Sequence, residues 1–210
     1  MPDDAAEFPQ GFFDRIDESP DPLFYALPRL VVHIDDATIA ALTRAYRDLL
    51  PAGSNVLDLM SSWVSHLPGD VTYGRVAGLG LNARELEANL RLTGRAVHDL
   101  NADPRLPYPD ASFDAVLCAV SVQYLTRPVE VFADVARVIR PGGRALVAIS
   151  HRCFPTKAIR AFHALAAEAR PRLVAEYFAR AGGFAPAEIL DRSPPAADPL
   201  WIVSARARGA

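Results

Sequence analysis

The sequence predicts an α/β protein with a doubly wound, mostly parallel sheet. Two observations predict this class. Short runs that are apolar throughout recur along the 210-residue chain, as at 55–59 and 113–119, and such runs are typical of strands buried on both faces. Segments with apolar residues at helical spacing lie between them, as at 36–50. Strands that alternate with helices form a parallel sheet, and right-handed crossovers cover both of its faces with helices.

The first half of the chain supplies three of the expected strands and two helices. A helix is expected over 36–50, because Asp35 or Asp36 can cap its first turn. Asn82-Ala-Arg-Glu85 is a capping box and predicts the start of a second helix. The elements expected here are the helices 36–50 and 82–90 and the strands 55–59, 72–79 and 95–98.

The second half continues the alternation. An almost continuous apolar run predicts a strand at 113–119. Pro128 suits the first turn of the next helix, since a missing N–H costs little there, and Pro141-Gly142-Gly143 is expected to end that helix. The remaining expected elements are a strand at 145–149, helical segments around 159–165 and 173–178, and closing strands at 187–190 and 200–205.

The chain is expected to divide into an N-terminal arm or lid, residues 1–35, and one α/β domain, residues 36–210. Five prolines in the first 30 residues exclude a long helix. Aromatic residues such as Phe12, Phe13 and Phe24 are atypical of a disordered tail. An arm folded over the body fits both facts, and it either closes a site or covers an apolar edge.

Composition argues against several classes of function. The formal net charge of −3 argues against a nucleic-acid or membrane-surface binder. The longest apolar stretch, near 115–120, is far shorter than the roughly 20 residues of a spanning helix. The acidic start of the chain is unlike a signal peptide, so we expect a soluble, cytoplasmic protein. Neither Cys118 and Cys153 nor the five histidines have metal-ligand spacing, and no metal is expected.

Polar residues crowd the segments that follow the predicted strands. In an open doubly wound sheet, ligands bind beyond the carboxyl ends of the strands. That rule selects the segments 60–66, 80–82, 99–100, 121–124 and 150–157. We therefore expect the functional site to be built from these five segments.

Three stretches carry a resemblance to a known family. They are Val56-Leu-Asp-Leu59, Leu106-Pro-Tyr-Pro-Asp-Ala-Ser-Phe-Asp-Ala-Val116 and Arg137-Val-Ile-Arg-Pro-Gly-Gly-Arg144. With Asp99 between the first two, this order resembles the class I S-adenosylmethionine-dependent methyltransferases, in the branch that acts on small molecules, over about residues 36 to 206. The resemblance implies a Rossmann-like sheet of seven strands with the last one antiparallel. It also implies S-adenosyl-L-methionine as cofactor and methyl transfer to a small-molecule acceptor by in-line displacement.

The resemblance also implies roles for particular residues. Asp58 matches the acid that supports the loop after the first strand. Asp99, with the backbone N–H of Leu100, matches the pair that reads the adenine edge, although Asp99 could instead cap a turn in the 101–104 loop. The cofactor-binding residues implied in this way are Asp58, Met60, Ser61, Ser62, Gly80, Asn82, Asp99, Leu100 and Ser121.

Two positions depart from the family's pattern. Where the family has Gly-x-Gly-x-Gly, this chain has Met60-Ser-Ser-Trp-Val64, although glycine allows positive φ and a close backbone approach there. Gly80 stands where the family carries the acid that holds the ribose hydroxyls, so Asn82 or Glu85 would have to replace that acid. The degenerate motif predicts weak cofactor binding, or a pocket occupied by Met60 and Trp63.

The acceptor side of the site is assigned to residues after the fourth and fifth strands. Gln123 and Tyr124 would face the acceptor, and His151 is a candidate general base or a hydrogen-bonding scaffold residue. Cys153 lies beside basic residues that are expected to lower its pKa, which suits a nucleophile or redox sensor; the alternative is a buried, inert thiol.

Three hypotheses remain open at this point. The first is a small-molecule methyltransferase, and the second is a binding or regulatory protein that keeps the fold with a remodelled cofactor pocket. The third is a non-methylating enzyme that uses Cys153 and His151. Ser121-Val-Gln-Tyr124 differs from the Asn/Asp-Pro-Pro-Tyr/Phe sequence of the family's nucleic-acid enzymes, so nucleic-acid methylation is not expected. A homodimer is left open.

Overall fold

The structure, a computed structural model that describes residues 8–209, contains one seven-stranded sheet in the order β3-β2-β1-β4-β5-β7-β6. The pairs among β1 to β5 are parallel, and β7 is antiparallel to both of its neighbours. The expected doubly wound, mostly parallel sheet with an antiparallel last strand is confirmed. The strands are β1 (Asn55–Leu59), β2 (Arg75–Gly80), β3 (Gly94–Val97), β4 (Phe113–Ala119), β5 (Ile139–Ile149), β6 (Glu188–Asp191) and β7 (Trp201–Arg206).

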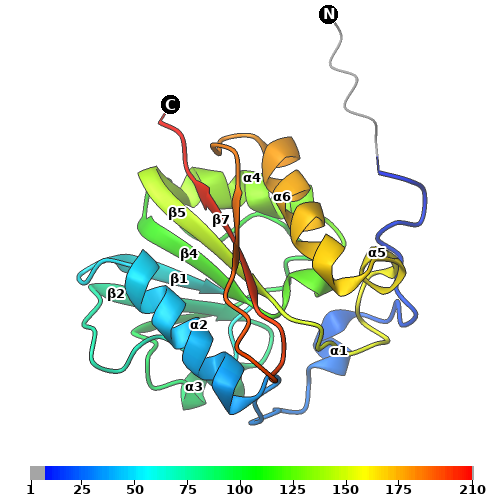
Figure 1. Ribbon diagram of the computed structural model, residues 1–210, viewed down its shortest axis with the longest axis horizontal. Helices are drawn as coiled ribbons and strands as arrows, with labels where there is room; N and C mark the ends of the chain where they lie inside the picture. Colours follow the sequence, from blue (N-terminus) through cyan, green and yellow to red (C-terminus); the bar gives the residue numbers. More distant parts are fainter. Residues whose placement is uncertain (1–7, 210) are drawn as a thin grey trace, which may run out of the picture.

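Helices lie on both faces of the sheet, with α2 on one face and α4 and α6 on the other (Figure 1). Strand residues alternate between the two faces: Val56 packs in the core beneath α2, and Leu57 packs in the core beneath α4 and α6. The helices are α1 (Asp21–Phe24), α2 (Asp36–Leu49), α3 (Ala83–Ala88), α4 (Pro128–Val138), α5 (Arg160–Ala164) and α6 (Arg170–Ala181), with the 3-10 turns η1 (Val122–Tyr124) and η2 (Ala167–Ala169).

The junction of α4 and β5 is where the expected boundaries are wrong. Pro141-Gly142-Gly143 was expected to end the helix as a turn, but α4 ends at Val138 and the three residues lie inside β5. The pairing of β4 with β5 is irregular here, and a Cβ on Gly143 would lie 2.7 Å from the carbonyl oxygen of Asp114. The glycine therefore allows two strand backbones to meet at a bulge. The other predicted strands are confirmed, with ends shifted by at most three residues.

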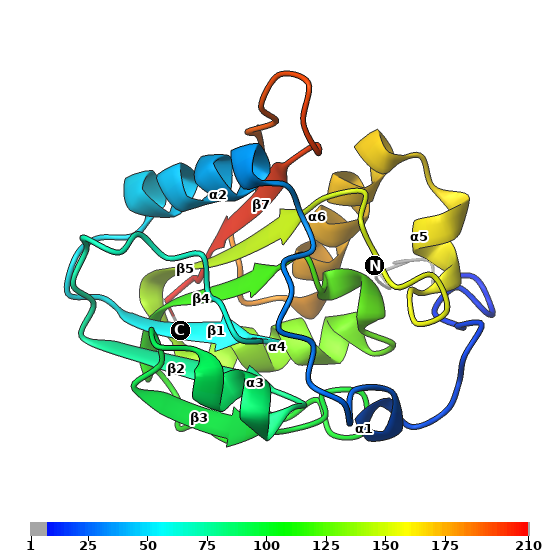
Figure 2. The ribbon, with the colours of Figure 1, turned by 90° about the horizontal axis from the view of Figure 1, so that it is seen from below.

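The arm, residues 8–35 of the described chain, is packed against the body. The ring of Phe8 lies 5.9 Å from that of Tyr177 on α6. The Lys157 ammonium is fully buried, donates to the carbonyl oxygen of Ser19 at 2.6 Å and lies 3.1 Å from the carboxylate of Asp21. Figure 2 shows the arm crossing the end of the sheet between α1 and α2. Within residues 8–209, no helix has the length and hydropathy to span a bilayer.

Candidate functional site

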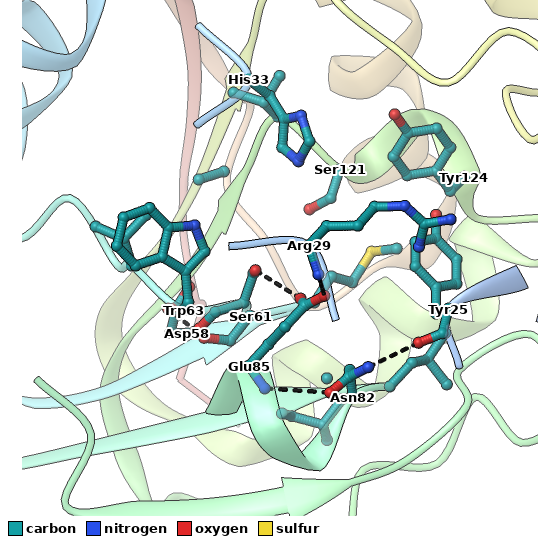
Figure 3. A pocket seen from close by; sticks show the side chains of 18 of the residues that line it. Tyr25, Arg29, His33, Asp58, Ser61, Trp63, Asn82, Glu85, Ser121 and Tyr124 are labelled. Atoms are coloured by element: carbon teal, nitrogen blue, oxygen red, sulfur yellow. Dashed lines mark hydrogen bonds between the residues drawn. The ribbon is translucent and has the colours of Figure 1, made fainter. Parts of the chain in front are cut away.

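A cavity lies at the carboxyl ends of β1 to β4, beneath the arm (Figure 3). It encloses about 1180 Å³, including the solvent at its mouth. Each of the four strands supplies a residue at its end or within two residues beyond it: Met60, Gly80, Asp99 and Ser121 line the wall. The cavity therefore lies where a doubly wound sheet binds its ligands.

Three cavity residues hold a backbone conformation that side chains disfavour. Met60, His66 and Val120 have φ values of 55°, 53° and 51°, in the left-handed region. For a β-branched residue such as Val120 this conformation is a clear outlier, and strained backbone tends to gather at functional sites. Met60 thus keeps, without glycine, the conformation for which a glycine is normally used.

The end of β2 explains why the expected acid is missing. The backbone N–H of Ser61 donates to the carbonyl oxygen of Leu79 at 2.7 Å, which brings the loop after β1 onto β2. A Cβ on Gly80 would lie 2.2 Å from the carbonyl oxygen of Ser61, closer than real Cβ contacts. No side chain fits at position 80 while this loop is in place.

Asp58, at the end of β1, is a buried carboxylate without a cationic partner in the described residues. Its Oδ2 accepts hydrogen bonds from the hydroxyls of Ser61 and Ser65, both at 2.6 Å. Burial raises the pKa of Asp58 to about 6, and the two hydroxyls oppose that rise. The carboxylate therefore ties two residues of the loop after β1, Ser61 and Ser65, to the end of the strand.

The start of α3 ties the arm to the cavity wall. The side chain of Asn82 accepts from the N–H groups of Arg84 and Glu85 at 3.0 and 3.1 Å, which confirms it as the N-cap. Its amide also donates to the carbonyl oxygen of Tyr25 at 2.9 Å. The capping box is only half formed, because the oxygens of Glu85 accept instead from the N–H of Arg29 and the hydroxyl of Ser62, both at 2.7 Å.

Asp99 and Leu100 lie at the end of β3, and both line the cavity. Oδ1 of Asp99 accepts from the N–H of Asn101 at 2.9 Å. This is the turn-capping contact that the sequence left open as the alternative for Asp99. This contact occupies Oδ1. Oδ2 of Asp99 accepts no hydrogen bond from the described residues of the turn.

Ser121 and Tyr124 line the cavity after β4. The Tyr124 hydroxyl accepts from the N–H of Phe154 at 2.8 Å, and burial raises the pKa of this phenol to about 12. Tyr124 therefore stays protonated at neutral pH and braces the loop after β5.

The other acceptor-side candidates lie outside the cavity lining. His151 is exposed, with Nε2 at 3.4 Å from Oδ1 of Asp198. Gln123 is buried and donates to the carbonyl oxygen of Val120 at 2.9 Å. For Cys153 the expected pKa direction is wrong: burial raises the pKa of the thiol, and the nearby Arg170 only partly opposes that rise.

The cavity residues without a signal in the sequence are those of the arm, such as Arg29 and His33, whereas His66 and Trp63 lie in the expected segment 60–66. Burial lowers the pKa of His33 and lowers that of His66 to about 4, so both imidazoles are neutral at pH 7. The indole Nε1 of Trp63 donates to the carbonyl oxygen of Val31 at 2.9 Å. Figure 3 shows that indole directed away from Asn82 and Tyr25, at one side of the pocket. Trp63 and Met60 thus form walls and leave the cavity open.

Comparison with known proteins agrees with this geometry. The family described as "Methyltransferase domain" matches residues 60–147. The 27-O-demethylrifamycin SV methyltransferase of Amycolatopsis mediterranei (strain S699) is 37% identical over 75 residues, which are 33% of this chain and 28% of that protein. The chain spans 18% to 38% of the length of the curated relatives it matches.

Solved structures share the fold at low sequence identity. The cyclase SpnF has a TM-score of 0.59 and 17% identity, and the match covers 80% of each chain. A phosphoethanolamine N-methyltransferase of Haemonchus contortus, solved with S-adenosyl-L-methionine, has a TM-score of 0.58 and 14% identity, covering 81% of this chain and 52% of that one.

The strand order, the reversed β7 and the cavity at the strand ends define a Rossmann-like methyltransferase fold. Residues 60–147 match the methyltransferase-domain family, and solved S-adenosylmethionine-dependent methyltransferases share the fold of the chain.

Proposed function

We propose that the protein transfers a methyl group from S-adenosyl-L-methionine to a small-molecule acceptor. The observation that carries this proposal is the cavity itself, which lies along the ends of β1 to β4 although the segment 60–64 has no glycine. The match of residues 60–147 to the methyltransferase-domain family supports this cofactor, as does a structural neighbour solved with S-adenosyl-L-methionine. The branch that the resemblance indicated favours a small acceptor, which would bind in the pocket beneath the arm.

The residues that line the cavity fit adenosylmethionine. Met60 keeps the left-handed backbone that lets the loop after β1 turn beneath a ligand, and Trp63 is held to the arm rather than across the space. Gly80 carries no acid, but Glu85 lines the cavity close by. A carboxylate offers about four acceptor positions, and the contacts with Arg29 and Ser62 use two of them.

Each part of the cofactor would then have a partner in this chain. Asp99 and the N–H of Leu100 would hold the adenine edge, and Glu85 would hold the ribose hydroxyls. Asp58 would fix the loop after β1 through Ser61. When bound, adenosylmethionine supplies an electrophilic methyl group whose C–S electron pair stays on sulfur as the acceptor atom takes the carbon.

In-line displacement depends on alignment more than on acid–base chemistry. The arm and Tyr124 would enclose the acceptor and exclude water. An acceptor that must lose a proton needs a base with a free nitrogen or oxygen within reach. His33 lines the cavity and is neutral, because burial lowers its pKa. It therefore suits that role better than His151, which lies outside the cavity lining.

Calorimetry with S-adenosylhomocysteine tests the proposal. We expect micromolar binding by the full chain, and at least about tenfold weaker binding by Asp99→Asn, which keeps an acceptor for the turn but loses the carboxylate. Asp103→Asn is the matched control, since Oδ1 of Asp103 also accepts a backbone N–H, that of Arg105 at 2.9 Å, on the exposed side of the same loop. Absence of heat at millimolar ligand would overturn the proposal.

A second candidate function is an enzyme of this fold that does not methylate. The observation that favours it is the fold similarity to SpnF, described as a cyclase. Adenosylhomocysteine binding without transfer to any acceptor would support that candidate. The raised pKa of the Cys153 thiol disfavours the hypothesis of a non-methylating enzyme that uses Cys153 and His151.

The proposed setting is the cytoplasm, with no nucleic-acid or membrane partner. Cys118 and Cys153 are both free thiols, as is usual in a reducing compartment. The net charge of −3 gives no electrostatic attraction to nucleic acid or anionic lipid. The arm exposes apolar residues such as Leu23 and Leu27. These residues could be buried in a homodimer, which sedimentation of the full chain would detect.

A further inference from the structure

The arm carries one arginine whose charge is not balanced within the described chain. Asp21, the buried carboxylate of the arm, is shared by Arg15 at 2.7 Å and Lys157 at 3.1 Å. Arg29 has no ion pair with any of the described residues, and its contact with Glu85 is made by the backbone N–H rather than by the guanidinium. Arg29 is thus left as a cation that lines the cavity.

The guanidinium of Arg29 is held among aromatic rings. Its central carbon lies 4.5 Å from the ring centre of Phe24, 5.3 Å from Phe154 and 5.6 Å from Tyr25. Nη2 donates to the carbonyl oxygen of Phe24 at 2.9 Å. The contacts with the rings and this hydrogen bond hold the cation in place.

One edge donor of this group is unused. Nη1 of Arg29 is buried and has no hydrogen-bond partner among the described residues. A buried donor without a partner is costly, and for a charged group the cost is larger. A planar guanidinium with a free edge matches the two oxygens of a carboxylate. Figure 3 shows the Arg29 side chain extending across the pocket between His33 and Tyr25.

A carboxylate at Arg29 could belong to the cofactor or to the acceptor. The position of the guanidinium distinguishes these two sources. The cofactor is expected along the ends of β1 to β4. The Arg29 guanidinium instead stacks on Phe154, which follows β5, and on Tyr25 of the arm. Phe154 also stacks on Tyr124 at 5.8 Å and meets His33 edge-on at 5.1 Å. The rings around the guanidinium therefore form an aromatic wall on the acceptor side of the cavity.

We propose that Arg29 binds the carboxylate of the acceptor, and that the acceptor is a small apolar or aromatic organic acid. This inference rests on the proposed methyltransferase function. Arg29 would act as a specificity residue: it holds the acid group while the aromatic walls hold the rest. Neutral analogues of the same shape would bind poorly, because they would leave the buried guanidinium unpaired.

Fluorine NMR titration of the full chain with 4-fluorobenzoate and 4-fluorobenzamide tests the proposal. We expect the wild-type protein to bind the acid at least about tenfold more tightly than the amide. Arg29→Met, which keeps apolar contact with the rings, should remove that preference, and Arg29→Lys should keep part of it. Arg75→Met is the matched control, since Arg75 also stacks on two rings, Tyr108 and Phe113 at 5.6 Å each, outside the cavity.

Equal affinity of the wild-type protein for the acid and the amide overturns the proposal, as does unchanged preference in Arg29→Met. Calorimetry on the same variant separates the two sources of the anion. We expect adenosylhomocysteine affinity to change less than about threefold. A loss of tenfold or more, with methylthioadenosine binding unchanged, would assign Arg29 to the cofactor carboxylate and overturn the acceptor assignment. If the wild-type protein binds no adenosylhomocysteine, the methyltransferase function fails, and the fluorobenzoate titration alone decides the anion site.

Discussion

The loop after β1 and the end of β2 both lack the residues that the family pattern assigns to them. The first has Met60-Ser-Ser where glycines are expected, and the second has Gly80 where an acid is expected. The structure gives the reason for the glycine at position 80. The loop after β1 comes so close to β2 that a Cβ on Gly80 would lie 2.2 Å from the carbonyl oxygen of Ser61.

The comparison teaches that a close approach between two backbones needs a small residue on only one of them. Here that residue is on β2, and the loop after β1 has side chains that the cavity wall uses. We propose that Glu85 of the next helix, whose carboxylate accepts from the hydroxyl of Ser62 at 2.7 Å, replaces the acid that is missing from β2. The glycine at position 80 therefore follows from the position of the loop after β1.

Restoring the family's acid at the end of β2 should have the largest effect. We expect Gly80→Asp to lower the free energy of unfolding by more than about 3 kcal/mol, because the new Cβ collides with a backbone carbonyl that cannot move alone. Gly94→Ala on β3 is the control, since a Cβ there would come no closer than 3.5 Å to the flexible side chain of Arg75. Urea denaturation measures both. Equal stability of the two variants would mean that the loop after β1 is not held against β2.

Asp58, the buried acid near the end of β1, should make the free energy of unfolding depend on pH. The pKa of Asp58 is raised to about 6, so its protonated form favours the folded state. The stabilisation is complete below the unfolded pKa of about 3.9 and is lost as pH rises through about 6, which amounts to about 3 kcal/mol. Asp58→Asn should remove this slope, so the variant should gain stability relative to wild type between pH 4 and pH 7.

Urea denaturation at a series of pH values tests this expectation. Asp114→Asn is the matched control of opposite sign. Burial pushes the pKa of Asp114 up, but the N–H of Asn55 and the guanidinium of Arg140 outweigh it, so the pKa is lowered. Stability from Asp114 is therefore present above its unfolded pKa and is lost as pH falls. Parallel pH profiles for wild type and Asp58→Asn would contradict a raised pKa at position 58.

Replacing the first residue of the loop after β1 should have the smallest effect. Met60→Gly relieves a φ of 55°, which is worth about 1 kcal/mol. It also removes a half-buried side chain that packs against the core, which costs a similar amount. We expect a change in the free energy of unfolding within about 1 kcal/mol by urea denaturation. A loss of more than about 3 kcal/mol would show that the side chain, rather than the backbone turn, holds the loop.

Local sequence patterns predict the strands, the helices and the ends of the strands that carry the site. Asn82 illustrates a rule that works, because an N-cap depends on residues three positions apart. Glu85 illustrates one that fails: local pattern pairs it with Asn82, but contacts with Ser62 and with Arg29, 56 residues away in the sequence, take its oxygens. Pro141-Gly142-Gly143 fails for a similar reason, because the neighbouring β4 decides its conformation.

The cavity residues of the arm are the part of the site that could not be predicted from the sequence. Arg29 and His33 stand in a proline-containing segment without helical or strand period, so no local rule gives their direction. Their place depends on the packing of the arm over the strand ends. Polar residues after strands are informative because topology gathers them, but no comparable rule applies to a covering arm.

The most direct test of the account is a crystal structure of the full chain grown with S-adenosylhomocysteine. The account predicts the nucleoside along the edge formed by Met60, Gly80 and Asp99, with Glu85 against the ribose hydroxyls and the arm above it. A ligand bound elsewhere, or a cavity that the side chains of Met60 and Trp63 fill while the nucleoside is excluded, would contradict it.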